Sequence, residues 1–250
     1  MIGMGTILNV AAILVGASLG VLIGHRIPER TRRTVTDGLG LAVLVIGGLN
    51  VVALTDADYV AAVGSGGTLL IVIGAILVGG IVGSALRIED RMEEFGGWLQ
   101  RTLTRGKAGA GAQRGRFIEG FVDASLVFCI GPLAILGSLS DGLGHGIEQL
   151  ALKATLDGFA SLAFAATLGW GVAASAIAVG IWQGLLTVLG FFLGEFLGTA
   201  MIASITATGG ILLLGVGLRM LQIRQVPVGN LLPALAVAPI LTAIVARVIA

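Results

Sequence analysis

Two aspartates lie inside long apolar segments, and they are the residues of this sequence best suited to chemistry. Asp123 is followed by Ser125, and Asp157 by Ser161. A charged side chain at the centre of a membrane helix costs about 2.5–3.5 kcal/mol, so each carboxylate is expected to face protein or water. Carboxylate and hydroxyl oxygens are the ligands that hard cations prefer. The four residues therefore predict a cation site. The alternative is that each carboxylate caps its helix or pairs with an arginine at the membrane interface.

Two amides and a proline add further polar groups. Asn9 and Gln183 each precede a run of regularly spaced glycines, and they are expected either to bind a solute or to form a hydrogen bond between helices. Pro132 removes a backbone donor and predicts a break or kink near Asp123. The carbonyls freed by such a break can line a cavity in the membrane. Pro233 and Pro239 predict similar breaks near the C-terminus.

Other kinds of chemistry find no support in the sequence. No His/Cys cluster has the spacing of a metal site, no Gly-x-x-x-x-Gly-Lys-Ser/Thr loop is present, and no serine, histidine and acid are grouped. We therefore expect no enzyme, no catalytic residue and no cofactor, and we leave the identity of any bound metal ion open. The formal net charge of +1 argues against a nucleic acid partner.

The composition identifies the elements that must position these residues. The chain is 56% hydrophobic and 12% charged, which leaves too little polar sequence to cover a soluble domain. Spanning helices need roughly 20 apolar residues, and this length predicts an all-α polytopic membrane protein with about eight transmembrane helices. Their expected positions are 4–24, 35–54, 66–87, 117–139, 150–170, 173–197, 204–222 and 230–249.

The same pattern of small residues occurs twice. The two copies are Asn9, Gly16, Gly20, Gly24 and Gln183, Gly190, Gly194, Gly198. The fourth and fifth helices also share a motif, at Ala124–Phe128 and Ala160–Phe164. We predict one integral membrane domain, 1–250, with an inverted, permuted repeat between a first half, 1–140, and a second half, 150–250. Helices one to three would correspond to helices six to eight, and helix four to helix five.

Arginine predicts the orientation of the chain in the membrane. The loops after helices one, three and seven are rich in arginine, whereas the alternate loops hold little basic charge beyond Lys153 and Arg247. The positive-inside rule therefore places 88–116 in the cytoplasm and both termini outside it. Within 88–116, the first part has apolar residues at helical spacing and predicts an amphipathic surface helix, and the rest is a basic loop.

Several motifs along the chain resemble one known family. They are Gly5–Asn9, His25–Arg30, Phe117–Phe121, Ala124–Cys129, Ala134–Leu139, Asp157–Ser161, Ala207–Gly210 and Val228–Pro233. Together they resemble the YqgA-type bacterial inner-membrane family (domain of unknown function 554). The resemblance implies a multi-pass protein of the bacterial inner membrane, and in that membrane the arginine pattern would place both termini in the periplasm. It also implies an ion pathway, since the family has been described as a candidate sodium channel or pump, and it assigns no catalytic residue.

The leading functional hypothesis is a secondary transporter or channel for a small cation such as Na⁺ or H⁺. Its site would lie between helices four and five and would use Asp123, Asp157, Ser125 and Ser161. One alternative is the transport of a small organic solute, with Asn9 and Gln183 as hydrogen-bonding groups. Another is a membrane scaffold or signalling protein whose basic loop binds lipid or protein. The expected partners are the lipid bilayer and the transported species, and homo-oligomer formation is left open.

Overall fold

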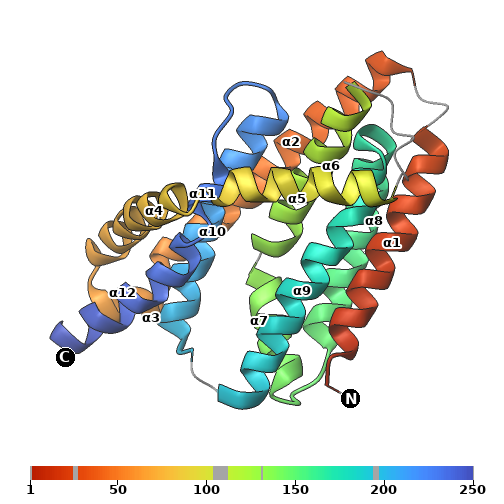
Figure 1. The fold of residues 1–250 in the computed structure, drawn as a ribbon. Helices are drawn as coiled ribbons and strands as arrows, with labels where there is room; N and C mark the ends of the chain where they lie inside the picture. The colour runs from red at the N-terminus through yellow and green to blue at the C-terminus, as the bar shows by residue number, and fades with distance from the viewer. Residues whose placement is uncertain (1, 25–27, 104–111, 131, 194–196, 250) are drawn as a thin grey trace. The chain divides into compact units, whose positions relative to one another are not determined.

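The computed structural model describes residues 2–24, 28–103, 112–130, 132–193 and 197–249, and every regular element in these residues is a helix (Figure 1). The elements are α1 (Met4–Gly24), α2 (Glu29–Val51), the 3₁₀ helix η1 (Val52–Thr55), α3 (Ala57–Val63), α4 (Gly67–Ala85), α5 (Ile88–Leu103), α6 (Ala112–Ile130), α7 (Pro132–Gly142), α8 (Glu148–Leu168), α9 (Trp170–Leu193), α10 (Thr199–Met220), α11 (Val228–Leu231) and α12 (Ala234–Ile249). Gly131, Gly194 and most of the predicted basic loop lie outside the described residues.

The all-α membrane architecture predicted from the sequence is confirmed. Among the described residues, 7 helices are long and apolar enough to cross a membrane, and the bent pair α6–α7 brings the number to 8 if it is one span. The helix predicted at the start of 88–116 is observed as α5. The short α3 was not predicted, because its seven residues are too few to show a membrane pattern.

The break predicted at Pro132 is also observed. The axes of 114–130 and 133–142 differ by 76°, and Pro132 is the first residue of α7. A proline is tolerated at this first position because its missing N–H would have no partner within the helix. Pro233 falls between α11 and α12, as the break predicted there requires. Pro239, in contrast, lies inside α12 and does not end it, and a kink at that position stays a prediction.

Contacts with α8 show that the bent pair runs the full length of that helix. A Cβ built on Gly120 would lie 3.0 Å from Leu168 Cβ, and one on Gly137 would lie 2.9 Å from Leu150 Cδ2. These two leucines are separated by about 27 Å along an α-helix. α6 therefore packs at one end of α8 and α7 at the other, as one bent span would require.

The chain forms two compact units. Unit 1 contains 1–40, 90–129 and 133–194, and unit 2 contains 41–89, 130–132 and 195–250. Each unit takes segments from both predicted halves, so the boundary between the units differs from the boundary between the halves. We describe each unit by itself.

Unit 1 is organised by a close contact between α1 and α8, which lie side by side in Figure 1. Gly16, Gly20 and Gly24 face the backbone carbonyls of Gly158, Leu162 and Ala166, and a Cβ on any of the three glycines would overlap its carbonyl oxygen. Small residues four positions apart let two helix backbones approach closely in a membrane. The residue numbers rise together along both helices, so α1 and α8 run parallel.

A buried carboxylate fixes the beginning of α1. Asp141, near the end of α7, accepts hydrogen bonds from the backbone N–H groups of Gly3 and Gly5, both at 3.1 Å. The first N–H groups of a helix have no partner within the helix, and the positive end of its dipole favours a negative charge. The contact therefore stabilises the start of α1.

In unit 1, α1 and α9 run in opposite directions, as the predicted inverted repeat requires. Thr6 faces Thr187, and Asn9 faces Gln183, so residue numbers rise along one helix as they fall along the other. Asn9 and Gln183 are also equivalent positions of the repeat, and so are Phe128 and Phe164, whose ring centroids are 5.9 Å apart. Two equivalent residues meet only near a twofold axis. Both pairs therefore support the repeat, although the superposition of the two sets of helices stays a prediction.

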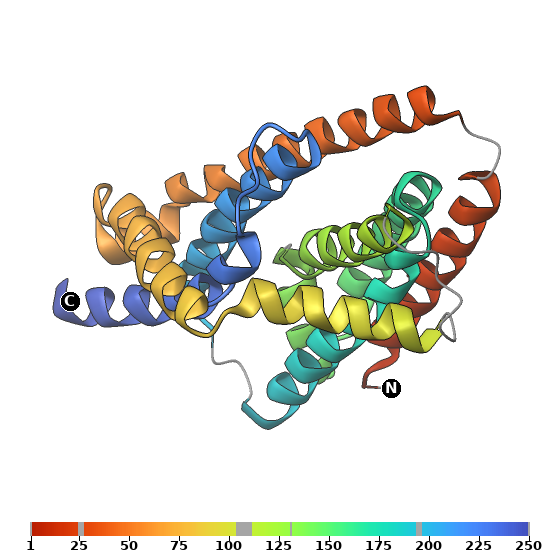
Figure 2. The ribbon, with the colours of Figure 1, turned by 45° about the horizontal axis from the view of Figure 1, so that its top comes forward.

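α5 lies beside α6 in unit 1 (Figure 2), and aromatic contacts attach the two helices. The ring of Phe95 stacks on Trp98, with centroids 5.6 Å apart, and lies 5.9 Å from Phe121 on α6. Gly96 packs against the same Phe121 ring. These contacts bury one edge of α5 against α6, while Trp98 remains exposed.

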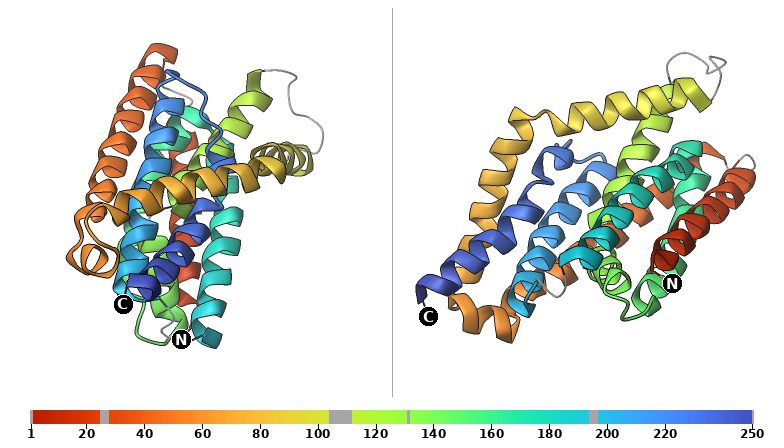
Figure 3. Two further views of the ribbon diagram at one scale, coloured as in Figure 1. Left: turned by 90° about the vertical axis from the view of Figure 1, so that its left-hand side faces the viewer. Right: turned by 60° about the horizontal axis from the view of Figure 1, so that its bottom comes forward.

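Unit 2 is also built on glycine contacts. α10 packs against α12, and α12 against α4, as Figure 3 shows on its right-hand side. Gly47 in the second part of α2 and Gly210 in α10 meet backbone to backbone, so a Cβ on either would lie 2.7–2.8 Å from the other's carbonyl oxygen. Gly79 on α4 packs in the same way on the first turn of α12, at Ala234.

A buried carboxylate holds the beginning of α11 in unit 2. Glu89 forms an ion pair with Arg219 and accepts a 2.6 Å hydrogen bond from the N–H of Gly229. The Asn230 side chain in turn accepts a hydrogen bond from the N–H of Glu89, at 3.0 Å. Both oxygens of Glu89 are occupied in this way, so we assign Glu89 a structural role.

The glycine contacts predict a large effect of one methyl group. We expect Gly20→Ala to lower the free energy of unfolding by about 1–3 kcal/mol, because the new Cβ would overlap the carbonyl of Leu162 and force the helices apart. Gly48 on α2 has no atom within 4 Å of a built Cβ, so Gly48→Ala should change stability by at most about 1 kcal/mol and in the stabilising direction. Thermal or denaturant unfolding in detergent micelles measures both values. Equal stability of the two variants would contradict the packing argument.

Candidate functional site

The polar centre of unit 1 is built around Asp157. This residue lies nine positions after Glu148, the first residue of α8, or about 14 Å along the helix axis. That distance places it near the middle of a spanning helix. The residue is nevertheless buried, at 7% exposure. A carboxylate at this depth needs partners, and the structure supplies them from α1 and α8.

Two donors reach the same oxygen of Asp157. The ammonium group of Lys153, one turn earlier on α8, forms an ion pair with Oδ2. Asn9 Nδ2 on α1 donates to Oδ2 as well, at 2.9 Å. Neither of these bonds involves Oδ1. The burial of Lys153, at 4% exposure, means that both members of the ion pair are removed from bulk water.

The Lys153 ammonium also contacts an aromatic ring. It lies 5.9 Å from the centroid of Phe128 on α6, within the range of a cation–π interaction. Three helices of unit 1 therefore surround the ion pair: α8 carries it, α1 supplies an amide and α6 supplies a ring.

Gln183 on α9 completes the cluster. Asn9 Nδ2 donates to Gln183 Oε1 at 3.3 Å, and both amide side chains are 0% exposed. The carboxylate of Asp157 requires the NH₂ end of Asn9, and that NH₂ group in turn requires the oxygen end of Gln183. This chain of requirements fixes the orientation of both amides.

The fixed orientations leave two polar atoms without hydrogen bonds. Among the described residues, neither Asn9 Oδ1 nor Gln183 Nε2 has a partner. One is an acceptor and the other a donor. An unsatisfied buried polar group costs about 1–3 kcal/mol, so each of the two atoms would gain from a hydrogen bond to water, an ion or a polar solute.

Hydroxyl groups lie next to the cluster. Thr6 Oγ1 and Thr187 Oγ1 are 3.5 Å apart, one turn from Asn9 and Gln183 respectively, and both residues are buried. Ser161 lies one turn after Asp157, where its hydroxyl donates to the carbonyl of Gly158 at 2.9 Å and packs against Gly16. The threonines add neutral oxygens to the site, and Ser161 also serves the α1–α8 contact.

The structure thus brings together three of the six residues that the sequence singled out, namely Asn9, Asp157 and Gln183, with Ser161 nearby. Asp123 and Ser125 lie on α6 and are both buried, at 2% exposure each. The Ser125 hydroxyl has no hydrogen-bond partner among the described residues. That Asp123 and Ser125 join the cluster around Asp157 stays a prediction.

Lys153 is the residue of this cluster that the sequence analysis missed. It was counted with the basic residues of the outer loops, and that assignment is wrong, because the side chain is buried inside α8. Its four-residue spacing from Asp157 on one helix was the available signal. Thr6 and Thr187 gave no signal, since isolated threonines are common in membrane helices.

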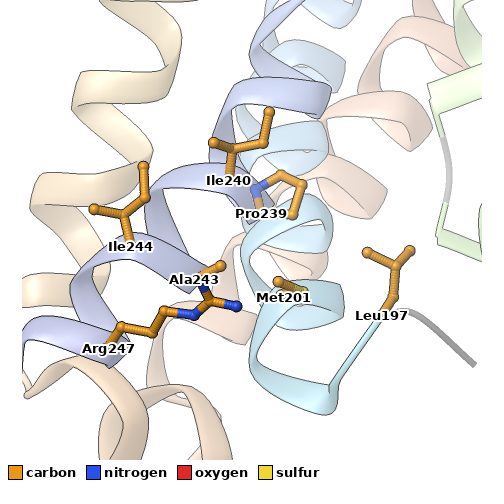
Figure 4. Close-up of a pocket in the computed structure, with 7 residues that line it drawn as sticks. All are labelled: Leu197, Met201, Pro239, Ile240, Ala243, Ile244 and Arg247. Carbon is orange, nitrogen blue, oxygen red and sulfur yellow. The ribbon is translucent and has the colours of Figure 1, made fainter. Parts of the chain in front are cut away.

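Unit 2 contains a groove of a different character. It encloses about 360 Å³ and is lined by Leu197, Met201, Pro239, Ile240, Ala243, Ile244 and Arg247 (Figure 4). Its lining is apolar apart from the single cation of Arg247 and includes no carboxylate. The groove therefore lacks the ligands for a cation, and the cluster in unit 1 is the better candidate site.

The buried ion pair predicts a non-additive effect on stability. Lys153→Gln or Asp157→Asn alone should each lower the free energy of unfolding by about 3–5 kcal/mol, because each leaves an uncompensated buried charge. The double variant should lose much less than the sum of the two, since it contains no unpaired charge. Denaturant unfolding of all four proteins in one detergent measures the coupling. Additive losses would show that the two side chains do not depend on each other.

Comparison with known proteins places the chain in a family. It is 31% identical to the uncharacterized protein YqgA of Escherichia coli (strain K12), with 96% of each chain covered. It is 29% identical to the uncharacterized membrane protein YdfK of Bacillus subtilis (strain 168), with 94% of each covered. No solved structure matches the chain. The family model described as "Protein of unknown function (DUF554)" matches residues 4–243, and the chain is therefore a membrane protein that belongs to this family.

Proposed function

We propose that the protein is a secondary transporter for a small monovalent cation, with Asp157 as its anionic ligand. The observation that carries the proposal is the position of Asp157, which is buried near the middle of a spanning helix. Among the described residues its two hydrogen-bond donors, Lys153 and Asn9, both reach Oδ2. A carboxylate that served only the fold would be expected to have both oxygens occupied, as Glu89 has in unit 2.

The neighbouring groups suit a hard cation. Asn9 Oδ1 is a buried carbonyl oxygen without a hydrogen bond among the described residues. Thr6 and Thr187 add two hydroxyl oxygens about one helical turn away. Oxygen ligands of this kind, with one negative charge among them, match the preference of small cations such as Na⁺. Proton transport would use the same carboxylate.

A small organic solute is the second candidate. This candidate is favoured by the two buried atoms that have no hydrogen bond among the described residues, because Gln183 Nε2 can donate a hydrogen bond and Asn9 Oδ1 can accept one. The site also carries both charges, on Lys153 and Asp157, so a zwitterionic solute would find complementary groups. Under this hypothesis transport would be specific for the solute, and the identity of the cation would have no effect on it.

We further propose that the protein lies in the bacterial inner membrane with both termini in the periplasm. The arginine-rich segments follow α1, α4 and α10, and the positive-inside rule places those segments in the cytoplasm. The parallel course of α1 and α8 agrees with four spans between their starting points, because four spans return the chain to the same side of the membrane.

Cysteine labelling tests the orientation. In a Cys129→Ser background, a membrane-impermeant maleimide added to intact cells should label Val248→Cys near the C-terminus. It should not label Glu94→Cys on α5 until the membrane is broken. Both positions are exposed on the protein, so the membrane accounts for any difference. Labelling of Glu94→Cys but not Val248→Cys in intact cells would reverse the topology.

Uptake into proteoliposomes tests the function. The wild-type chain should take up at least one of Na⁺, K⁺ and Li⁺, and Asp157→Asn should reduce that uptake at least about tenfold, because the site loses its charge. Lys153→Gln/Asp157→Asn preserves neutrality and should fold but remain inactive. Asp58→Asn, on the exposed side of the short α3, is the matched control and should transport normally. Full uptake by the folded Asp157→Asn protein would overturn the assignment, and solute-specific uptake would favour the second candidate.

A further inference from the structure

We propose that Lys153 is a built-in competitor for the transported cation, so that each cation bound at Asp157 displaces one proton from Lys153. Transport would then be an electroneutral exchange of one cation for one proton. This inference rests on the proposed function, and it specifies the coupling ion and the residue that carries it.

The first support is the position of the ammonium group. Lys153 Nζ contacts Asp157 Oδ2, which is also the oxygen that receives Asn9 Nδ2. A positive charge is therefore already present where a transported cation would bind. The Phe128 ring, 5.9 Å from Nζ, favours the charged form at the same place.

The order of the two residues is the second support. On a helix, an acid placed four residues before a base stabilises more than the reverse order, because it agrees with the helix dipole. Lys153 precedes Asp157, so the pair has the order that stabilises a helix less. The order does place Lys153 one turn nearer the end at which α8 begins, where a released proton has the shorter route to water.

Charge balance is the third support. If Lys153 kept its proton when a cation bound, two positive charges would share one carboxylate. At about 4 Å and an effective dielectric constant of about 20, their repulsion would weaken binding roughly a thousandfold. Loss of one proton from Lys153 removes that repulsion and restores the original net charge.

The surroundings contain few other groups that could carry the proton. The helices α1 and α9, which pack against α8, contain no titratable side chain. On α6, the Cys129 thiol interacts electrostatically with both Lys153 and Asp157, and Asp123 lies two turns before it. On α7, Asp141 is engaged by the backbone of Gly3 and Gly5. Glu119, Arg114 and Arg116 belong to the first turns of α6, which pack at the far end of α8, near Leu168.

The exchange step is balanced in atoms and charge. The ammonium of Lys153 gives one proton to water and becomes a neutral amine. The cation then binds the carboxylate of Asp157, and the neutral amine of Lys153 can donate its nitrogen lone pair to the bound cation. One positive charge enters the site and one leaves it. Release of the cation on the other side of the membrane and reprotonation of Lys153 complete the cycle, so a pH gradient would drive transport and the membrane potential would not.

The experiment uses the full chain in proteoliposomes that contain a pH-sensitive dye, with the membrane potential clamped by K⁺ and valinomycin. An inward Na⁺ gradient should make the lumen alkaline as Na⁺ enters, at a rate that is the same at every clamped potential. Na⁺ uptake without a luminal pH change would overturn the inference and leave the proposed function intact. Absence of uptake for every cation tested would instead reject both.

Two variants of Lys153 separate its role from that of Asp157. Lys153→Arg keeps a charge that a guanidinium does not give up in proteins, so Na⁺ uptake should fall at least about tenfold. Lys153→Met removes the exchangeable proton, so Na⁺ should enter without luminal alkalinisation and at a rate that depends on the potential. Proton exchange that persists in Lys153→Met would assign the proton to Asp157 and overturn the inference, as would wild-type exchange by Lys153→Arg. Thermal unfolding checks that each variant folds, and the wild-type measurements alone still decide whether cation uptake is coupled to proton exchange.

Discussion

The close approach of α1 and α8 is the constraint on which the rest of unit 1 depends. Lipid tails are as apolar as leucine side chains, so membrane helices gain little from the hydrophobic effect when they associate and rely on tight packing instead. Gly16, Gly20 and Gly24 provide that packing, because each presents only backbone to a carbonyl of α8. The contact holds the two helices parallel and at the small separation that the short side chain of Asn9 needs to reach Asp157.

That separation determines the chemistry of the site. Lys153 and Asp157 balance each other in charge, and the carboxylate orients Asn9, which in turn orients Gln183. Each of these orientations follows because a buried hydrogen-bond donor requires an acceptor where little water can reach it. The sequence of requirements ends with one free donor and one free acceptor among the described residues. A fully satisfied network would have no such atoms, and these two are what the proposed ligand site depends on.

Unit 2 uses the same packing device without producing a comparable site. Gly47 and Gly210 bring α2 and α10 into backbone contact, as the glycines of α1 do with α8. The buried carboxylate of unit 2, Glu89, forms an ion pair and accepts a backbone hydrogen bond, one on each oxygen. The two ion pairs therefore differ. The pair of Glu89 and Arg219 stabilises the structure around α11 with both carboxylate oxygens engaged. In the pair of Lys153 and Asp157, both donors reach Oδ2 of the carboxylate.

The sequence by itself determined the class of protein, most of the helices, the break at Pro132 and the opposite directions of α1 and α9. These features follow from local patterns, namely apolar length, proline chemistry, arginine distribution and repeated glycines. It also singled out Asn9, Asp157 and Gln183, because polar groups are conspicuous in apolar segments. Only the tertiary structure decided that these three share one hydrogen-bonded cluster and that Lys153 belongs with them. The physical reason is that the cluster joins residues more than 140 positions apart. The glycines of α1 indicate that this helix packs closely on another, but they do not specify which one.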